Sequence, residues 1–303
     1  MARLLCLLLL LLWAGPAYAW GPAIHVAVAS AALEAAVRLG LPLAALLLRH
    51  RRAFLQGTLA ADQTVAKSLA APEDHCHNWE VAFRLLEAAG EEATAAFVWG
   101  YLAHLAADTV AHNLFVPHHL VSHPQCRGAA HAYWEVRADE LAGEAAWSRL
   151  ARLAGGGHRD GERLLAAHLR PTLFSHGVSR RLFGGWVAVV SRPGWRRAVG
   201  RAALRSRWPL SPVVLRPYRD LAVARTVELL ARGPEAACVR CEDPTGRAAL
   251  RRAGRLRRLL RQGGWSDEVA AFVPGQGVSC ATGGVTSQGR WARLQAMEPP
   301  RTS

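Results

Sequence analysis

The sequence predicts an all-α fold, a multi-helix bundle that continues into a basic, helical C-terminal half. Two observations favour this class. β-branched residues never gather into the alternating pattern of a strand. Apolar residues instead recur at helical spacing, in HVAVASAALEAAVRL (25–39), WEVAFRLLEAA (79–89), ATAAFVWGYLAHLAAD (93–108) and RDLAVARTVELLA (219–231). Half of the chain is hydrophobic (51%), so it can bury a sizeable core.

The first 19 residues predict a secretory signal peptide. MARLLCLLLLLLWAGPAYA combines one arginine, a leucine-rich core and a small-residue end at Ala17 and Ala19. A membrane anchor would need about 20 apolar residues, and Pro16 interrupts this run early. Cleavage after Ala19 would make Trp20 the first residue of a secreted or periplasmic protein.

Charge divides the remaining chain unevenly. Residues 20–148 carry 8 basic and 13 acidic side chains, whereas residues 149–303 carry 28 basic and 10 acidic ones. All but one of the 37 basic residues are arginine, which a bias in codon use would also produce. An acidic half joined to a basic half suggests one part that performs chemistry and another that faces anions.

Composition also suggests where domains end. The glycine-rich stretch LAGGGHRDG (153–161) is the best boundary candidate. We therefore expect a helical domain at 20–150 and an Arg-rich helical region at 151–262. Glycine, serine, threonine and proline increase afterwards and helical periodicity fades, so 263–303 is expected to be a loosely ordered tail.

An odd number of cysteines remains after cleavage: Cys76, Cys126, Cys238, Cys241 and Cys280. At least one thiol is therefore unpaired or pairs between chains. Cys238 and Cys241 form a lone C-x-x-C. A structural disulfide is favoured there over metal or redox chemistry.

Two helical segments carry imidazole and carboxylate groups at intervals of four. His104, Asp108 and His112 project from one face of an apolar helix, and His131 and Glu135 repeat the spacing. A buried polar stripe satisfied by hydrogen bonds is one interpretation. A column of metal ligands is the other, because helical His, Asp and Glu residues four apart can bind a shared ion.

Other candidate ligands precede these helices. His25 follows Trp20 closely, Asp62 ends FLQGTLAAD, and His75 and His77 flank Cys76. Each has a structural alternative, such as a hydrogen-bonded core histidine or a helix cap. Their joint occurrence favours a polynuclear metal site, because buried carboxylates without a compensating cation are costly.

These residues also occur in a recognisable order. It reads Trp20, His25, Asp62, His77 (or His75), His104, Asp108, His112, His131 and Glu135. With QGTLAAD and AHAYWEVRADE, this order resembles the zinc-dependent phospholipase C family, whose relatives include single-strand nucleases. The resemblance covers about residues 20–145.

One departure is the third helix ligand, which better-known members place six residues after the aspartate with a proline between. Here His112 comes four residues after Asp108 on a continuous helical pattern, and His118, His119 and His123 are alternatives.

The resemblance implies up to three zinc ions. One is bound by Trp20, through its free amine and carbonyl oxygen, with His25 and Asp108; a second by Asp62, His77, His104 and Asp108; a third by His112, His131 and Glu135. Asp62 is the candidate for orienting or deprotonating the attacking water. The implied reaction is phosphodiester hydrolysis of a phospholipid head group, and the final glutamate favours phospholipases over the nucleases, which have aspartate there.

Two alternatives remain open from sequence. One is a single-strand nuclease with the same metal chemistry, and the other is a non-catalytic, zinc-stabilised module that binds membranes or polyanions. RPGWRRAVGRAALRSRW (192–208) and GRAALRRAGRLRRLLRQ (246–262) combine arginines with apolar residues, which suits an anionic phospholipid membrane surface. Nucleic acid would fit the charge equally well.

Overall fold

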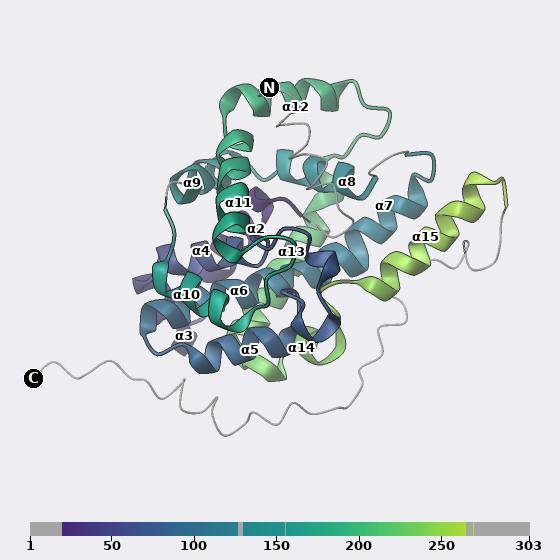
Figure 1. Cartoon of the computed structure of the whole chain (residues 1–303). Coiled ribbons are helices and arrows are strands. Elements are labelled where there is room, and N and C mark those ends of the chain that lie inside the picture. The colour runs from purple at the N-terminus through teal and green to yellow at the C-terminus, as the bar shows by residue number, and fades with distance from the viewer. Residues whose placement is uncertain (1–19, 127–129, 155, 265–268, 270–303) are drawn as a thin grey trace, which may run out of the picture.

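The computed structural model describes residues 20–126, 130–154, 156–264 and 269 (Figure 1). The expected signal peptide and most of the expected tail lie outside these residues. In the described part every regular element is a helix, which confirms the all-α class. The helices in order are α2 (Pro22–Arg38), α3 (Pro42–Arg49), α4 (Arg51–Ala60), η1 (Lys67–Leu69), η2 (Pro72–Asp74), α5 (Trp79–Ala88), α6 (Glu92–Val110), η3 (Ala111–Phe115), α7 (Val116–Ser122), α8 (Ala130–Glu140), α9 (Glu144–Ala154), α10 (Arg159–His168), α11 (His176–Val190), α12 (Pro193–Leu204), α13 (Pro212–Arg232), η4 (Gly233–Glu235), α14 (Ala237–Cys241) and α15 (Arg247–Arg261).

Helix α6 forms the centre of the bundle (Figure 1). Every residue from Thr94 to Val110 is buried, because α2, α4, α5 and α13 pack around it. A helix enclosed on all sides has to be apolar all round, and this one is built almost entirely of alanine and large apolar residues. The few polar side chains that it carries are therefore held in a dry environment.

Two glycines allow α4 and α6 to touch through their backbones. A Cβ atom on Gly57 would overlap with the carbonyl oxygen of Phe97, and one on Gly100 would overlap with that of Phe54. Thr58 Oγ1 also donates to the Gly100 carbonyl oxygen at 3.1 Å. The close approach places the end of α4 against the middle of α6.

The sequence predicted a continuous α-helix through His112, but the helical segment that begins with α6 is not α-helical throughout. A π-helical turn, η3, follows Val110 and leads into α7. Pro117 lies at the start of α7 and has no N–H to donate to the carbonyl four residues back, so the α-helical ladder cannot continue unchanged here. A π turn adds a residue to the turn and redirects the side chains that it carries.

Helices from both halves of the chain share one core. α13 packs against α2 and α6, and α15 packs against α7. α11 contacts α9, and α12 contacts α8, so that this helix pair lies over the first half of the chain (Figure 1). No helix among the described residues is both long and apolar enough to cross a membrane.

The cysteines do not pair within the C-x-x-C. Cys241 is disulfide-bonded, whereas Cys238 is a buried free thiol. Cys76 and Cys126 are also free and buried, and Cys280 lies outside the described residues. Burial raises the pKa of the Cys238 thiol to about 12, which suits an inert core residue.

Replacing Gly100 with alanine tests the contact between α4 and α6. The added methyl group would force the two backbones apart, so Gly100→Ala is expected to lower the free energy of unfolding by about 1–3 kcal/mol or more in a urea titration. Gly254→Ala in α15 is the control, because a Cβ there meets open space. Alanine should stabilise that helix by about 0.5–1 kcal/mol. Equal stability of Gly100→Ala and the parent protein would contradict the close approach.

Candidate metal centre

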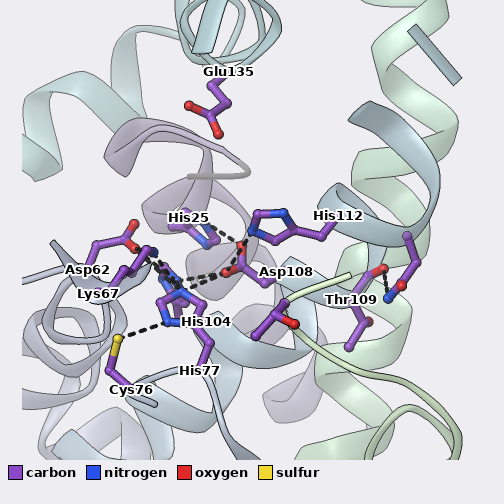
Figure 2. A network of polar contacts seen from close by, with 12 residues as sticks. His25, Asp62, Lys67, Cys76, His77, His104, Asp108, Thr109, His112 and Glu135 are labelled. Atoms are coloured by element: carbon purple, nitrogen blue, oxygen red, sulfur yellow. Dashed lines mark hydrogen bonds and ion pairs between the residues drawn. The ribbon is translucent and has the colours of Figure 1, made fainter. Parts of the chain in front are cut away.

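Potential metal ligands from four segments meet inside the bundle (Figure 2). Asp62 follows α4, His77 precedes α5, His104 and Asp108 belong to α6, and His25 belongs to α2. All five side chains are buried. Ligand atoms of His77, His104 and Asp108 lie within 4.8 Å of one another, as do those of His25, Asp62 and His104. The predicted ligands of two ions are therefore adjacent in the fold.

The orientation of His104 is set by a backbone contact. Its Nδ1 lies 2.9 Å from the carbonyl oxygen of Thr58, which can only accept a hydrogen bond. Nδ1 therefore carries the proton, and the lone pair of Nε2 faces the cluster. Metal-binding histidines usually donate their second nitrogen in this way. The contact exists because Gly57 and Gly100 bring α4 so close to α6.

Ligand atoms of His77, His104 and Asp108 have the spacing that one zinc ion requires, and Asp62 Oδ1 lies near the two imidazoles. His77 Nε2 lies 2.9 Å from Asp108 Oδ2, 3.1 Å from His104 Nε2 and 3.4 Å from Asp62 Oδ1. His104 Nε2 lies 3.2 Å from Asp108 Oδ2 and 3.8 Å from Asp62 Oδ1. Zinc ligands at about 2.0–2.1 Å in a tetrahedron are roughly 3.3–3.4 Å apart. The donor set therefore fits zinc in kind and in spacing.

Asp108 faces histidines with both carboxylate oxygens. Oδ2 faces His77 and His104 and lies 3.7 Å from His112 Nε2, while Oδ1 lies 3.3 Å from His25 Nε2. Burial would raise the pKa of Asp108, but the neighbouring histidines, His104 first, hold it well below its ordinary range. An ionised carboxylate with two differently surrounded oxygens is suited to bridge two cations.

His25 occupies the side of the cluster towards the chain start. Its ring stacks on that of His104 with the centroids 3.8 Å apart, its Nε2 faces Asp108, and its Nδ1 is buried without a hydrogen-bond partner. The indole of Trp20 is fully buried and packs against His25 and Phe115. Unsatisfied buried nitrogens are costly, so this position requires a partner that protein atoms do not supply.

A second group lies on the other side of Asp108. His131 Nε2 and Glu135 Oε1 of α8 are 3.0 Å apart, and the rings of His112 and His131 are 5.4 Å apart. Burial raises the pKa of Glu135, whose carboxylate points towards the cluster (Figure 2). His112 Nδ1 is buried without a hydrogen-bond partner, whereas His131 Nε2 and Glu135 Oε1 face each other. A cation would satisfy these atoms.

The structure gives the alternative histidines other contacts than those of His77 and His112. His75 Nδ1 accepts the backbone N–H of His77 at 3.0 Å, so His75 supports the loop while His77 faces Asp108. His118 contacts the hydroxyl of Tyr218, and His119 Nδ1 lies 2.8 Å from the carbonyl oxygen of Phe115. His123 packs its ring against Trp134.

The π-helical turn positions His112 beside Asp108 instead. Gly246 lies directly against His112, where a Cβ atom would overlap with the His112 side chain and carbonyl. Gly246 has a φ of +58°, which favours glycine as well. The turn before α15 therefore closes on the residue that carries this ligand, and a part of the chain outside the expected domain at 20–150 helps to form the site.

Sequence reasoning missed two residues at the site. Lys67 Nζ lies 2.6 Å from Asp62 Oδ1 and 3.1 Å from His77 Nε2. One feature of the sequence could have pointed to Lys67, because it is the single basic residue that is not arginine. Asp139 accepts the backbone N–H of Ile24 at 2.8 Å and touches Gly21, so it holds the segment that follows Trp20. Burial raises the pKa of Asp139 to about 7.

A cavity of about 650 Å³ opens beside the ligands. Trp20, Asp62 and Glu135 lie on its inner side. Its walls are largely apolar and include four aromatic side chains, which are Trp147 from α9, Phe183 and Trp186 from α11, and Trp195 from α12. Asp139, Glu140, Glu144, Arg196 and Arg197 also line it. The cavity therefore connects an apolar surface to the buried polar cluster.

Comparison with known proteins agrees with this geometry. A family model described as zinc dependent phospholipase C matches residues 24–164. This range contains the predicted ligands other than Trp20, which lies just before it. No curated protein and no solved structure matches the chain. Residues 24–164 therefore match the zinc-dependent phospholipase C family, and this match supports a zinc-dependent phospholipase C-type hydrolase.

Proposed function

We propose that this protein is a secreted phospholipase C that hydrolyses phospholipid head groups and releases diacylglycerol. The family implies a phospholipid substrate. The observation that carries the proposal is the aromatic cavity beside the ligand cluster, because a lipid offers an apolar part and a phosphodiester to one continuous site. The zinc ligands in this proposal are Trp20, His25, Asp62, His77, His104, Asp108, His112, His131 and Glu135.

Zinc would supply Lewis acidity here, since it lowers the pKa of a water molecule and stabilises negative charge on phosphate oxygens. The protein supplies orientation. Asp62 lines the cavity and also belongs to the ligand cluster. Burial would raise the pKa of Asp62, but Lys67 and the histidines hold it well below its ordinary range. The carboxylate is therefore ionised and can accept a hydrogen bond that orients the attacking water.

The cavity walls favour a lipid over a nucleic acid. Trp147 and Phe183 are buried, and Trp186 and Trp195 are half-buried, so they offer apolar contact area near the ligands. The carboxylates on the α8 and α9 side would repel a polyanionic strand. Arg196 is already paired with Glu144 at 2.6 Å and lies over the Trp147 ring at 5.0 Å.

The connection between α12 and α13 is our candidate for contact with an anionic membrane. Leu204 is 88% exposed and Val213 is 79% exposed, values that are unusual for large apolar side chains. Arg201, Arg205 and Arg207 lie exposed around them. Apolar residues among arginines suit the interface of a bilayer with anionic lipids. α12 also lines the cavity, so contact here would bring lipid close to the site.

The substrate can be settled by one pair of assays. We expect the purified mature protein to release diacylglycerol from phosphatidylcholine vesicles, to lose this activity with a chelator and to regain it with zinc. Faster release from vesicles that also contain anionic lipid would support the membrane surface at α12 and α13. Chelator-sensitive cleavage of single-stranded DNA without lipid hydrolysis would instead favour the nuclease, and no zinc-dependent turnover of either would favour the binding module.

Substitution of the bridging aspartate tests the ligand set. Asp108→Asn and His104→Ala are expected to lower zinc content in elemental analysis and to reduce activity by more than about 100-fold, because even outer-shell changes cost about 10–100-fold. Asp220→Asn on the exposed side of α13 is the matched control and should keep both. His112→Ala should also lose zinc. Full zinc and activity in Asp108→Asn would exclude its bridging role.

The role of the first residue can be tested without changing any side chain. A form that begins with Met before Trp20 turns the Trp20 amine into an amide, which has no lone pair to offer. We expect this form to bind one zinc fewer than the form that begins with Trp20 and to hydrolyse lipid far more slowly. Equal zinc content and equal rates would mean that Trp20 only packs against His25.

A further inference from the structure

Lys67 is the single lysine of the chain. The other 36 of the 37 basic residues are arginine, including those that form partly buried ion pairs, such as Arg225 with Glu242 at 2.7 Å. The lysine begins η1 and is 3% exposed. A chain that uses arginine at every other basic position has a lysine only where the ammonium group lies among candidate zinc ligands.

The ammonium group uses atoms that a zinc ion would use. The ammonium nitrogen lies 3.1 Å from His77 Nε2, the nitrogen that a zinc ion would use. The second contact, at 2.6 Å, is with Asp62 Oδ1. Asp62 and His77 both belong to the cluster of candidate ligands (Figure 2).

Size and charge explain the preference for lysine. A guanidinium is a broad planar fork, whereas an ammonium is a compact point charge that fits beside two ligand atoms. A lysine amine is ordinarily protonated at neutral pH, and the Asp62 carboxylate at 2.6 Å compensates its buried charge. Lys67 therefore carries a full positive charge next to the position that zinc would take, and like charges at a few Å repel.

We propose that Lys67 is a built-in counter-cation of the metal centre, which holds Asp62 and His77 together in the metal-free protein and competes with zinc for them. Lys67 is therefore a positioning residue that acts through Asp62 and His77. It does not line the cavity. Its ammonium stabilises the metal-free fold and weakens the affinity of this site for zinc. The inference rests on the zinc ligands proposed above and not on the identity of the substrate.

Carbon-13 labelling of lysine provides a direct readout. The side-chain Cε resonance of a protein with one lysine reports on Lys67 alone. Addition of zinc to the metal-free protein is expected to shift this resonance, because the ammonium must leave His77. The same addition to Asp108→Asn, which is expected to bind zinc poorly, should shift it less. A resonance that stays in place while zinc binds to the parent protein would overturn the proposal.

Variants at Lys67 test the competition itself. Lys67→Met keeps the length of the side chain and removes the charge. We expect the melting temperature of its metal-free form to fall, and its affinity for zinc, measured by competition with a chelator, to rise by about tenfold or more. Lys67→Arg keeps the charge and should not gain affinity. Arg225→Met is the control for loss of a partly buried cation, and it should lower stability without tightening zinc binding.

Two results would contradict this inference. Weaker or unchanged zinc binding in Lys67→Met would show that the amine supports the ligands instead of competing with zinc. An unchanged melting temperature of the metal-free variant would show that the amine does not hold Asp62 and His77 together. If Asp108→Asn had lost zinc and activity all the same, the proposed function would stand and only the role of Lys67 would fall.

Discussion

The backbone contact between α4 and α6 is the constraint on which the rest of the site depends. Gly57 and Gly100 remove the Cβ atoms that would keep the two helices apart. The Thr58 carbonyl can then reach His104 and set its tautomer, and Asp62, which follows α4, lies within 3.8 Å of the same imidazole. A wider crossing would break the hydrogen bond and move Asp62 away from His104.

Buried charge is the second determinant of this centre. Asp62 and Asp108 are buried in the bundle, and an unpaired buried carboxylate is costly. The histidines around them cannot all be protonated, since burial lowers the pKa of His104 and holds that of His112 well below its ordinary range. Neutral imidazoles and ionised carboxylates are the forms that bind metal. The buried carboxylates therefore require positive charge, which Lys67 supplies next to Asp62 in the metal-free protein and which zinc would supply when bound.

Helices beyond the matched family region complete the site. α11 and α12 add aromatic walls to the cavity, and the turn at Gly246 closes on His112. In the proposed function the metal ligands come from α2, α6, α8 and the segments next to α4 and α5, while the later helices form the surface that the lipid meets. The Arg-rich composition of this half is compatible with an anionic membrane, because its arginines are largely exposed.

The sequence alone determined the helical class and the candidate ligands on α6, because periodicity is local: residues four apart on one helix share a face wherever that helix packs. It also placed His25, Asp62, His131 and Glu135 among the candidates. The sequence did not show which of His75 and His77 faces Asp108, or whether His112 or a later histidine lies beside it. Those choices depended on which loop atoms met α6 and on a π-helical turn next to Pro117. Nor could it place Lys67, whose role arises only when residues ten positions apart close around one point. Long-range packing decided these features because no local pattern encodes the position of one backbone against another.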